Sequence, residues 1–485
     1  MIKKFFYTSH RILGVVTCLL FLMWFITGLV LIYHSFPDVD KSLRNSNADN
    51  LVSATLPNLQ EMELPNQLKS LSIGQLGDET ILTYKDKKEH RIATSSMQPI
   101  KGINLEDVKR IANIWVDAPI LKIDTLDKRD IWIMYDKYVK ELPIYKVHFD
   151  DKEQHQLYIS SRTGEVQQFT TKSERVWAYL GSIPHKLYIP ALRQHTAVWI
   201  GVLTTLATLC FIACITGLVL GIRAYIARYK RTGKFSSPYK KPWYKWHNVL
   251  GLIFGIFLLF WAISGMMALR KTPQWLVKTH QNYPYSKVMQ GKAIILTDFK
   301  LDYRDIVAKY PDTKNIRWKY FYNAPYYEAT IGGKLVSIDA SIPHIVELFT
   351  IKESDLASAI EEIHGNSVAF DIKIIDKYEE YYLPWKRELP LPAYKVSVNS
   401  IDKNVYYIAT DGSKITHLDK NRKARKWLFK APHYLHFQFL MERPVLWTIT
   451  IWVLALGCSA ICLSGVVLSI KYIGRKTNKH NKKCD

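Results

Sequence analysis

Four histidines occupy matched positions in the two halves of this sequence. His10 and His247 each open a long apolar run, and His185 and His433 each follow a proline shortly before another such run. Neutral imidazole is the commonest metal ligand among protein side chains. Two imidazoles that face each other across a helix bundle suit a six-coordinate haem iron. The spacing therefore predicts two haem sites, one at each end of the apolar runs.

The pairing of these histidines depends on a repeat that covers most of the chain. In the first and third runs, Trp and Gly lie fourteen and eighteen residues after the histidine, as Trp24 and Gly28 and as Trp261 and Gly265. In the second and fourth runs, Pro-His is followed at identical spacing by Trp199, Cys210, Cys214 and Gly217 and by Trp447, Cys458, Cys462 and Gly465. This self-similarity predicts a parallel repeat with a pseudo-two-fold axis along the membrane normal.

Four apolar runs must position the histidines, and each is long enough to cross a bilayer, which needs about 20 mainly apolar residues. Their interiors lack Asp, Glu, Lys and Arg, and they cover Ile12–Tyr33, Ala197–Ile222, Val249–Leu269 and Leu446–Ile470. The first run is too long for the apolar part of a signal peptide, so we expect a retained signal anchor. The sequence predicts a four-helix transmembrane bundle.

The charge pattern predicts how these helices are oriented. The chain has 485 residues and a formal net charge of +23, from 66 Lys+Arg and 43 Asp+Glu. Basic residues gather at the N-terminus, in the tail, and in the stretch between the second and third runs, which contains no acid. Short basic segments stay in the cytoplasm, so the excess indicates a membrane protein and not a nucleic-acid-binding one.

The resulting organisation alternates membrane and exported segments. We expect transmembrane segments at 1–36, 191–224, 247–270 and 433–472, a basic cytoplasmic loop at 225–246 and a cytoplasmic tail at 473–485. The two long polar segments, 37–190 and 271–432, should be extracytoplasmic domains. Such a topology fits a multi-pass protein of a bacterial inner membrane, with both termini in the cytoplasm and the domains in the periplasm.

The exported segments have the pattern of α+β domains. Residues 145–149 and 156–160 alternate apolar and polar side chains as strands do, and the Arg162-Thr-Gly turn signal follows. Residues 105–115 and 354–363 have the apolar spacing of helices. The predicted fold class is therefore an α-helical membrane protein with a bundle of two parallel repeats and two α+β extracytoplasmic domains.

Other candidate ligands are less symmetric. His195, His436 and His34 have no histidine at the matching position of the other half. His436 and His195 are further candidates for contact with the outer cofactor, as ligands or as partners of its propionates, or they are plain interfacial residues. Zinc fits less well because its sites usually include thiolate or carboxylate. The absence of acids inside the runs argues against a proton relay or an ion-coupled carrier.

Small residues complete the pattern inside the runs. The cysteine pairs, at i and i+4, are interpreted as packing residues. Four hydroxyl–glycine dipeptides allow close helix approach or leave room for a flat macrocycle: Thr27-Gly28, Thr216-Gly217, Ser264-Gly265 and Ser464-Gly465.

These residues together resemble the PepSY-associated transmembrane family. The likeness is carried by His10-Arg-Ile-Leu-Gly with Trp24 and Thr27-Gly28, by the two Pro-His pairs, and by the Tyr-Lys-Val, Tyr-Ile and Thr-Gly-Glu stretches of residues 145–165. Family members of this size include inner-membrane ferric-siderophore reductases with two haems b. The resemblance implies that His10, His185, His247 and His433 bind two haems b. It also implies that Fe(III) in a ferric siderophore or similar chelate is reduced in the periplasm.

Sequence features that are missing bear on the source of the electrons and on the alternative functions. No Gly-x-Gly-x-x-Gly motif opens a βαβ unit, so electrons would come from quinol or a cytoplasmic reductase and not directly from NAD(P)H. Other PepSY proteins are thought to restrain peptidases, so a non-enzymatic module that binds a peptidase or envelope partner is the main alternative. A permease is the second alternative, disfavoured by four helices without interior charge. No further catalytic residue is predicted.

Overall fold

The computed structural model describes residues 2–386 and 388–484, with side chains for residues 4–386 and 388–475. The chain forms two compact units. The membrane unit comprises Met1–Phe36, Ser173–Lys278 and Asn421–Asp485, and the strand unit comprises Pro37–Lys172 and Thr279–Lys420. Residues 173–190 and 421–432, at the ends of the expected exported segments, therefore belong with the long helices.

The membrane unit is built on four long helices: α1 (Ile2–Tyr33), α7 (Thr196–Thr232), α8 (Pro242–Ala268) and α15 (Pro444–Cys484). Among the described residues, these four are long and apolar enough to span a membrane, with hydropathy of 2.3 to 2.7. The prediction of a four-helix membrane protein is confirmed. Gly233 ends α7 with a φ of 66°, and Pro242 opens α8, so the connection spans residues 233–241 within the expected loop.

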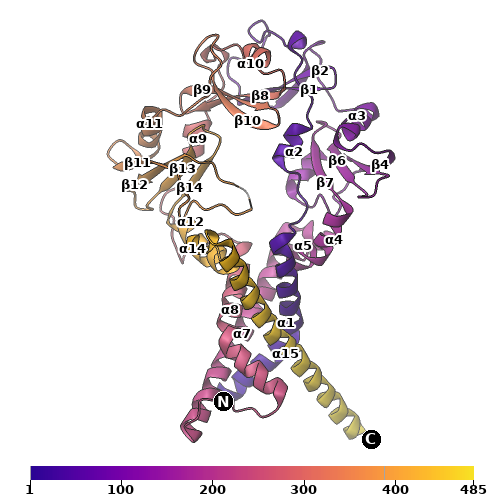
Figure 1. Ribbon diagram of the computed structural model, residues 1–485, viewed down its shortest axis with the longest axis vertical. Coiled ribbons are helices and arrows are strands. Elements are labelled where there is room, and N and C mark those ends of the chain that lie inside the picture. Colours follow the sequence, from indigo (N-terminus) through magenta and orange to yellow (C-terminus); the bar gives the residue numbers. More distant parts are fainter. Residues whose placement is uncertain (1, 387, 485) are drawn as a thin grey trace. The chain divides into compact units, whose positions relative to one another are not determined.

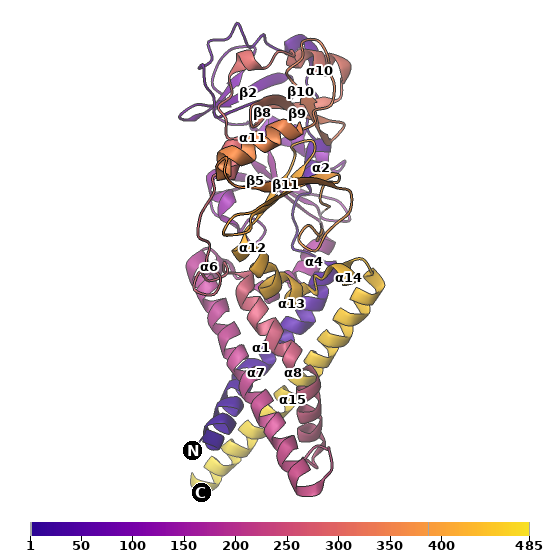
Figure 2. The same cartoon turned by 90° about the vertical axis from the view of Figure 1, so that its left-hand side faces the viewer.

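The four helices pack in a closed cycle, in which α1 and α8 each contact both α7 and α15 (Figure 2). As a result, α1 and α8 lie at opposite corners of the bundle. Their shared core includes Phe21, Phe25 and Leu258 together with Cys210 and Cys458. Helices in lipid gain little from the hydrophobic effect, so their association depends on close packing and on small interface residues.

Short helices precede α7 and α15 and carry the two Pro-His pairs. They are α4 (Lys172–Leu180), α5 (Ser182–Lys186) and α6 (Pro190–Arg193) in the first half, and α12 (Lys420–Arg425), the π-helix η4 (Lys426–Lys430), α13 (Ala431–Tyr434) and α14 (Gln438–Met441) in the second. α5 packs against α1 (Figure 1), and α13 packs against α8. Leu187 and Leu435 end α5 and α13 in the left-handed conformation, with φ of 47° and 52°. That conformation costs a leucine roughly 1–2 kcal/mol, so the surrounding contacts must hold it.

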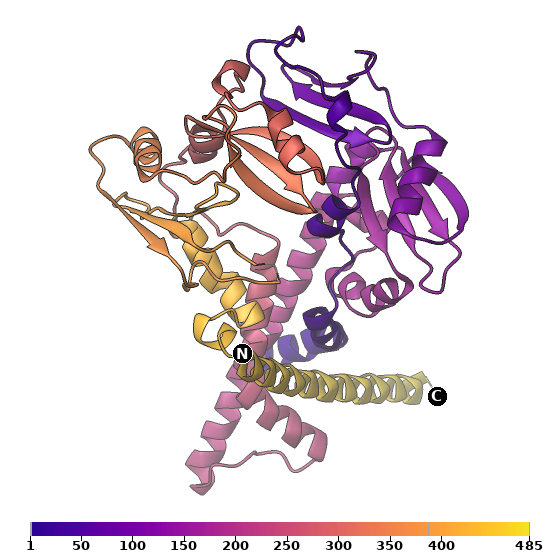
Figure 3. The same ribbon diagram turned by 45° about the horizontal axis from the view of Figure 1, so that its top comes forward.

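The strand unit contains a six-stranded sheet to which both polar segments contribute. Its order is β10-β9-β8-β1-β2-β3, with β1 (Ser70–Leu76), β2 (Glu79–Lys85), β3 (Glu89–Ala93), β8 (Thr313–Phe321), β9 (Ala324–Ile331) and β10 (Lys334–Asp339). The central strands β1 and β8 pair antiparallel, with Ile73 opposite Ile316 (Figure 3). Leu71, Leu82 and Trp318 are buried in the core of this sheet, beside α10 (Tyr303–Lys309).

Two four-stranded antiparallel sheets complete the strand unit. The first is β4 (Ile120–Leu126), β5 (Ile144–Phe149), β6 (Gln156–Ser160) and β7 (Val166–Thr170), preceded by α3 (Leu105–Trp115). The second is β11 (Phe370–Ile375), β12 (Ala393–Val398), β13 (Val405–Ala409) and β14 (Ile415–Leu418), preceded by α11 (Glu353–His364). The predicted helices and strands of these segments are confirmed, and so is their α+β character. Asn104 and Asp107 form a capping box that starts α3.

Candidate cofactor site

The first histidine pair joins opposite corners of the bundle. His10 lies on α1 and His247 on α8, and their ring centres are 6.2 Å apart with an angle of 42° between the ring planes. Because α1 and α8 are diagonal neighbours, each imidazole reaches the other across the space between α7 and α15. The structure thus brings together the two residues that the repeat predicted as one pair.

The second pair comes from the short helices. His185 on α5 and His433 on α13 have ring centres 6.5 Å apart and an interplanar angle of 70°. Both residues are only partly exposed. A metal binds the neutral imidazole, so each ring must keep one nitrogen without a proton.

Hydrogen bonds fix the tautomer of the first-half histidines. His10 Nδ1 lies 3.0 Å from the Ala213 carbonyl oxygen, and His185 Nδ1 lies 3.1 Å from the Trp24 carbonyl oxygen. A carbonyl oxygen can only accept, so Nδ1 carries the proton in both rings and Nε2 keeps its lone pair. The Thr216 and Thr27 hydroxyls are also within 3.4 and 3.1 Å of these Nδ1 atoms.

The second-half histidines reach the same tautomer through serines. His247 Nδ1 is 2.9 Å from Ser464 Oγ, and His433 Nδ1 is 3.1 Å from Ser264 Oγ. Each serine hydroxyl donates its only proton to a carbonyl of its own helix, of Ile461 and Trp261 respectively, and so accepts from the imidazole. In the part of the chain that the structure describes, no protein group bonds to Nε2 of any of the four rings.

A glycine supports each histidine next to the hydroxyl that anchors it. A methyl group built on Gly217 would lie 2.7 Å from His10 Cε1, and one built on Gly28 would lie 3.4 Å from His185 Cε1. The corresponding distances are 3.7 Å from Gly465 to His247 and 3.8 Å from Gly265 to His433. The four hydroxyl–glycine dipeptides thus position the histidine rings. Sequence analysis had assigned them only to helix packing or to cofactor room.

Two tryptophans hold the short helices of the second pair. Trp199 Nε1 donates to the Lys186 carbonyl at 2.8 Å, and Trp447 Nε1 donates to the Tyr434 carbonyl at 2.8 Å. Each acceptor belongs to the residue directly after the histidine, where the short helix leaves carbonyl groups without helical partners. Trp261 Nε1 in addition donates to the His433 carbonyl at 3.0 Å. These indoles fix the backbone that carries His185 and His433.

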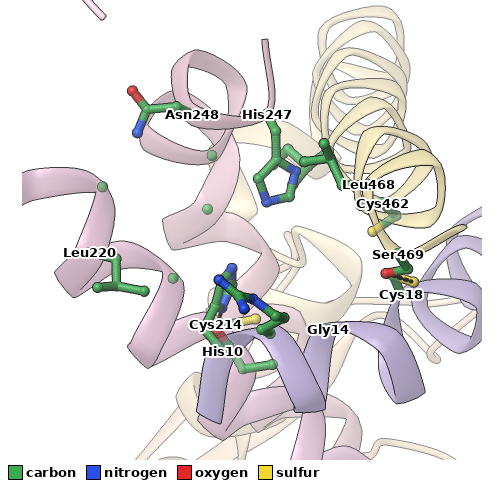
Figure 4. A pocket seen from close by; sticks show the side chains of 18 of the residues that line it. His10, Gly14, Cys18, Cys214, Leu220, His247, Asn248, Cys462, Leu468 and Ser469 are labelled. Carbon is green, nitrogen blue, oxygen red and sulfur yellow. Dashed lines mark hydrogen bonds between the residues drawn. The ribbon is translucent and has the colours of Figure 1, made fainter. Parts of the chain in front are cut away.

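A pocket of about 440 Å³ surrounds the first pair (Figure 4). All four long helices contribute to its wall, which includes Cys214, Cys462 and Leu258. Six of its residues are glycines: Gly14, Gly217, Gly221, Gly251, Gly255 and Gly465. A methyl group on Gly14 or Gly251, one helical turn past each histidine, would meet no atom within 4 Å. The helix surfaces facing the pocket are therefore flat and open, as a planar ligand needs.

Both pairs fit a haem by the chemistry and spacing of their donors. Two imidazoles bound to opposite sides of one metal ion, at a typical metal–nitrogen distance of about 2.0 Å, have ring centres roughly 6.3 Å apart. The separations of 6.2 and 6.5 Å match that value. An Nδ1–H held by a protein acceptor, with Nε2 free, is the arrangement that orients metal-binding histidines.

The remaining predicted candidates lie elsewhere in the membrane unit. His436 is buried, at 2% exposure, three residues after His433. His195 is exposed at the N-cap of α7. His34 stacks on Trp177, with ring centres 4.0 Å apart and an angle of 2° between the planes. Contact of these three histidines with a cofactor stays a prediction. The two close ring pairs are formed by the other four histidines, which occupy matched positions in the two halves.

Three of the cysteines lie in the hydrophobic core formed by the long helices. Cys210, Cys458 and Cys462 are buried as free thiols among Phe21, Phe25 and Leu258. Among the described residues, no three His, Cys, Asp or Glu side chains gather as a metal site made of protein ligands alone. Their surroundings are those of the packing residues that the sequence predicts.

Comparison with known proteins gives one match over nearly the whole chain. A family model described as "PepSY-associated TM region" matches residues 7–471, which include all four paired histidines. No curated protein matches the sequence.

Proposed function

Since this chain belongs to the PepSY-associated transmembrane family, a multi-pass membrane family, we propose that it is a di-haem b transmembrane oxidoreductase. It would pass electrons across a bacterial inner membrane to Fe(III) in a ferric siderophore or similar chelate on the periplasmic side. His10 and His247 would hold one haem, and His185 and His433 the other. When bound, the haem irons supply reversible one-electron chemistry.

One observation carries this proposal: two facing imidazole pairs, each with Nδ1 anchored and Nε2 unbonded. Such a pair leaves two nitrogen lone pairs available to a metal ion placed between the rings, because Nδ1 of each ring already has its hydrogen-bond partner. The same hydroxyl–glycine cradle occurs at all four positions.

The chain's own residues set the spacing of the two sites. His10 and Thr27, which contacts His185, are separated by seventeen residues of α1, and His247 and Ser264 by seventeen residues of α8. At 1.5 Å per residue this corresponds to about 25 Å along the bundle. This separation is slightly smaller than the thickness of the hydrocarbon core of a bilayer, which is roughly 30 Å. This placement supports electron passage across the membrane.

The direction of transfer rests on the charge pattern of the sequence, and the substrate rests on the resemblance to ferric-siderophore reductases. The basic connection at 233–241 and the basic C-terminal tail support a cytoplasmic location for one end of the bundle, by the positive-inside rule. The strand unit would then face the periplasm, where the ferric chelate is reduced. Quinol or a cytoplasmic reductase would supply electrons.

The test is a visible spectrum of the purified protein, followed by reoxidation. Detergent-purified protein from haem-replete cells should contain about two haems b per chain by pyridine haemochrome assay, and dithionite should give sharp α and β bands. Ferric chelates should then reoxidise the reduced protein, and a Fe(II) trap should report the product.

Either of two results would redirect the assignment. A colourless protein that copurifies with a peptidase or envelope protein would favour the non-enzymatic PepSY module. Uptake of a ferric chelate into liposomes without a reductant would favour a permease.

A further inference from the structure

The pocket around His10 and His247 has two chemically different ends. Along α1 its lining runs from Tyr7 and Arg11 to Cys18 and Phe21, which is deeper in the bundle. The same gradient occurs on α15, from Tyr472 and Arg475 at one end to the apolar and thiol residues Ile461 and Cys462 at the other. The pocket is therefore amphipathic along the bundle axis.

The polar end carries positive charge without a compensating acid. Its lining includes Arg11 and Arg475, and the described lining residues include no Asp or Glu. Arg11 lies with its guanidinium 5.0 Å from the centre of the Tyr472 ring. Among the described side chains, neither arginine forms an ion pair with a carboxylate. Two guanidinium groups thus stand at the mouth of a cavity that contains no anion of the protein.

Further hydrogen-bonding groups lie beside these arginines. Tyr239, Tyr244 and Asn248 line the same end of the pocket, from the connection and from the start of α8. Burial, with the neighbouring Tyr7 as a smaller cause, raises the pKa of Tyr239 to about 12, so its hydroxyl stays protonated. A ligand that fills this space should present acceptors, and preferably anions, to the mouth and apolar groups to the deep end.

Haem b has this polarity, with two propionate carboxylates at one edge of the macrocycle and apolar substituents at the opposite edge. We propose that Arg11 and Arg475 bind the two propionates of the haem held by His10 and His247. This inference rests on the proposed function, and it adds an orientation: the carboxylate edge faces the ends of α1 and α15, and the apolar edge faces Cys214 and Cys462. Arginine suits this role because its planar fork matches a carboxylate.

The inference can be tested by comparing haem with its dimethyl ester, in which both carboxylates are neutral. The full-length His433→Ala protein, prepared from haem-limited cells, restricts loading to the first pair. Soret titration should show haem binding about tenfold more tightly than the ester, since exposed arginine–carboxylate pairs each contribute a few-fold. In the same background, Arg11→Gln with Arg475→Gln should bring this ratio close to one.

A matched control and the contrary outcomes separate the inference from the proposed function. Arg231→Gln, on the exposed end of α7 and outside the pocket lining, should keep the tenfold preference. Equal affinity for haem and ester in the parent protein, or an unchanged preference in the double variant, would overturn the arginine assignment while the haem proposal stands. If neither compound binds, both proposals fall.

An anionic lipid is the other occupant that this mouth could attract. Mass spectrometry of lipids retained by the purified parent and double-variant proteins distinguishes it. Loss of an acidic lipid in the double variant, together with an unchanged haem-to-ester ratio, would show that the arginines bind lipid and would reject the propionate assignment.

Discussion

The two histidine pairs reach the same donor geometry by different scaffolds. His10 and His247 lie within long helices, so the packing of α1 and α8 against α7 and α15 fixes their backbone. His185 and His433 lie on helices of four or five residues, which end at a left-handed leucine and are held by tryptophan hydrogen bonds. The hydroxyl–glycine cradle is common to both. The comparison teaches that the cradle sets the orientation of the histidine ring, while the scaffold that carries it can vary.

Removal of a ligand should have the largest effect and should separate the pairs. His10→Ala or His247→Ala should lower the haem content from about two to about one per chain, and so should His185→Ala or His433→Ala, because each haem requires both of its ligands. Pyridine haemochrome assay measures the content. Combining His10→Ala with His185→Ala should remove all haem, whereas His10→Ala with His247→Ala should retain one. Two haems in every single variant would disprove the ligand assignment.

Within the second pair, the anchoring hydroxyls should differ in importance. Ser264→Ala removes the hydroxyl acceptor of His433 Nδ1–H, and loss of such a support typically weakens metal affinity by about 10–100-fold. Thr27→Val should cost less, because the Trp24 carbonyl still accepts from His185 Nδ1 at 3.1 Å. Soret titrations of the two variants make the comparison. Equal losses would mean that the carbonyl contributes nothing to ring orientation.

Replacing a supporting glycine by alanine should weaken haem binding more at the first pair than at the second. Gly217→Ala places a methyl group 2.7 Å from His10 Cε1, which forces the ring or helix to shift. Overpacking of this kind costs about 1–3 kcal/mol, so haem affinity at the first pair should fall about tenfold. Gly265→Ala is the matched control, since its methyl group would lie 3.8 Å from His433 Cε1, an ordinary contact distance. Similar haem retention in both variants would argue against close support of His10.

The indole hydrogen bonds should matter to the second pair alone. Trp447→Phe removes a neutral hydrogen bond to the Tyr434 carbonyl, worth about 1 kcal/mol, so affinity there should fall about fivefold. The first pair, carried by long helices, should be unchanged. Trp452→Phe is the control, because that indole on the same helix bonds instead to the Tyr33 hydroxyl. Site-resolved titrations in single-haem backgrounds report both affinities, and a loss at the first pair would contradict the separation of scaffolds.

The smallest predicted effect concerns the strand unit, where the stability of the folded protein should depend on pH independently of haem. Burial lowers the pKa of His364 to about 4, and its Nε2 lies 2.9 Å from the Tyr406 hydroxyl. An unfolded chain would protonate this histidine below about pH 6.5 while the folded protein resists, so its contribution to stability is complete above pH 6.5 and is lost as pH falls towards 4. In His364→Gln, the decrease in unfolding temperature between pH 7 and pH 5 should be smaller than in wild type. An equal decrease in His364→Gln and in wild type would contradict this assignment.

Much of this site could be predicted from the sequence because its signals are local and repeated. Long apolar runs determine the membrane helices, and equal spacings pair His10 with His247 and His185 with His433. The functions of Thr27, Ser264 and their equivalents could not be read in this way, because a hydroxyl in an apolar helix usually bonds to its own backbone. Their matched positions seventeen residues after His10 and His247 were the available signal.

The shared sheet illustrates what sequence patterns omit. The strands β1 and β8 each have the periodicity of a strand, but their pairing joins residues 243 positions apart, such as Ile73 and Ile316. Local propensity carries no information about such a partner. The patterns predicted strands at 145–149 and 156–160, which lie in a four-stranded sheet of the first half. The six strands of the shared sheet, three from each exported segment, were not predicted.

That β1–β8 junction gives the polypeptide the character of a fused dimer. Each half contributes three consecutive strands to either side of the junction, in mirrored order, and the link between halves in the membrane unit is confined to residues 233–241. We expect that a chain divided at this link would persist as a stable heterodimer of two fragments, detectable by copurification after coexpression. Separate elution of the fragments would refute this. The two halves of a fused dimer need not keep identical sequences. The predicted repeat is consistent with this, since threonines contact the histidines of one half and serines those of the other.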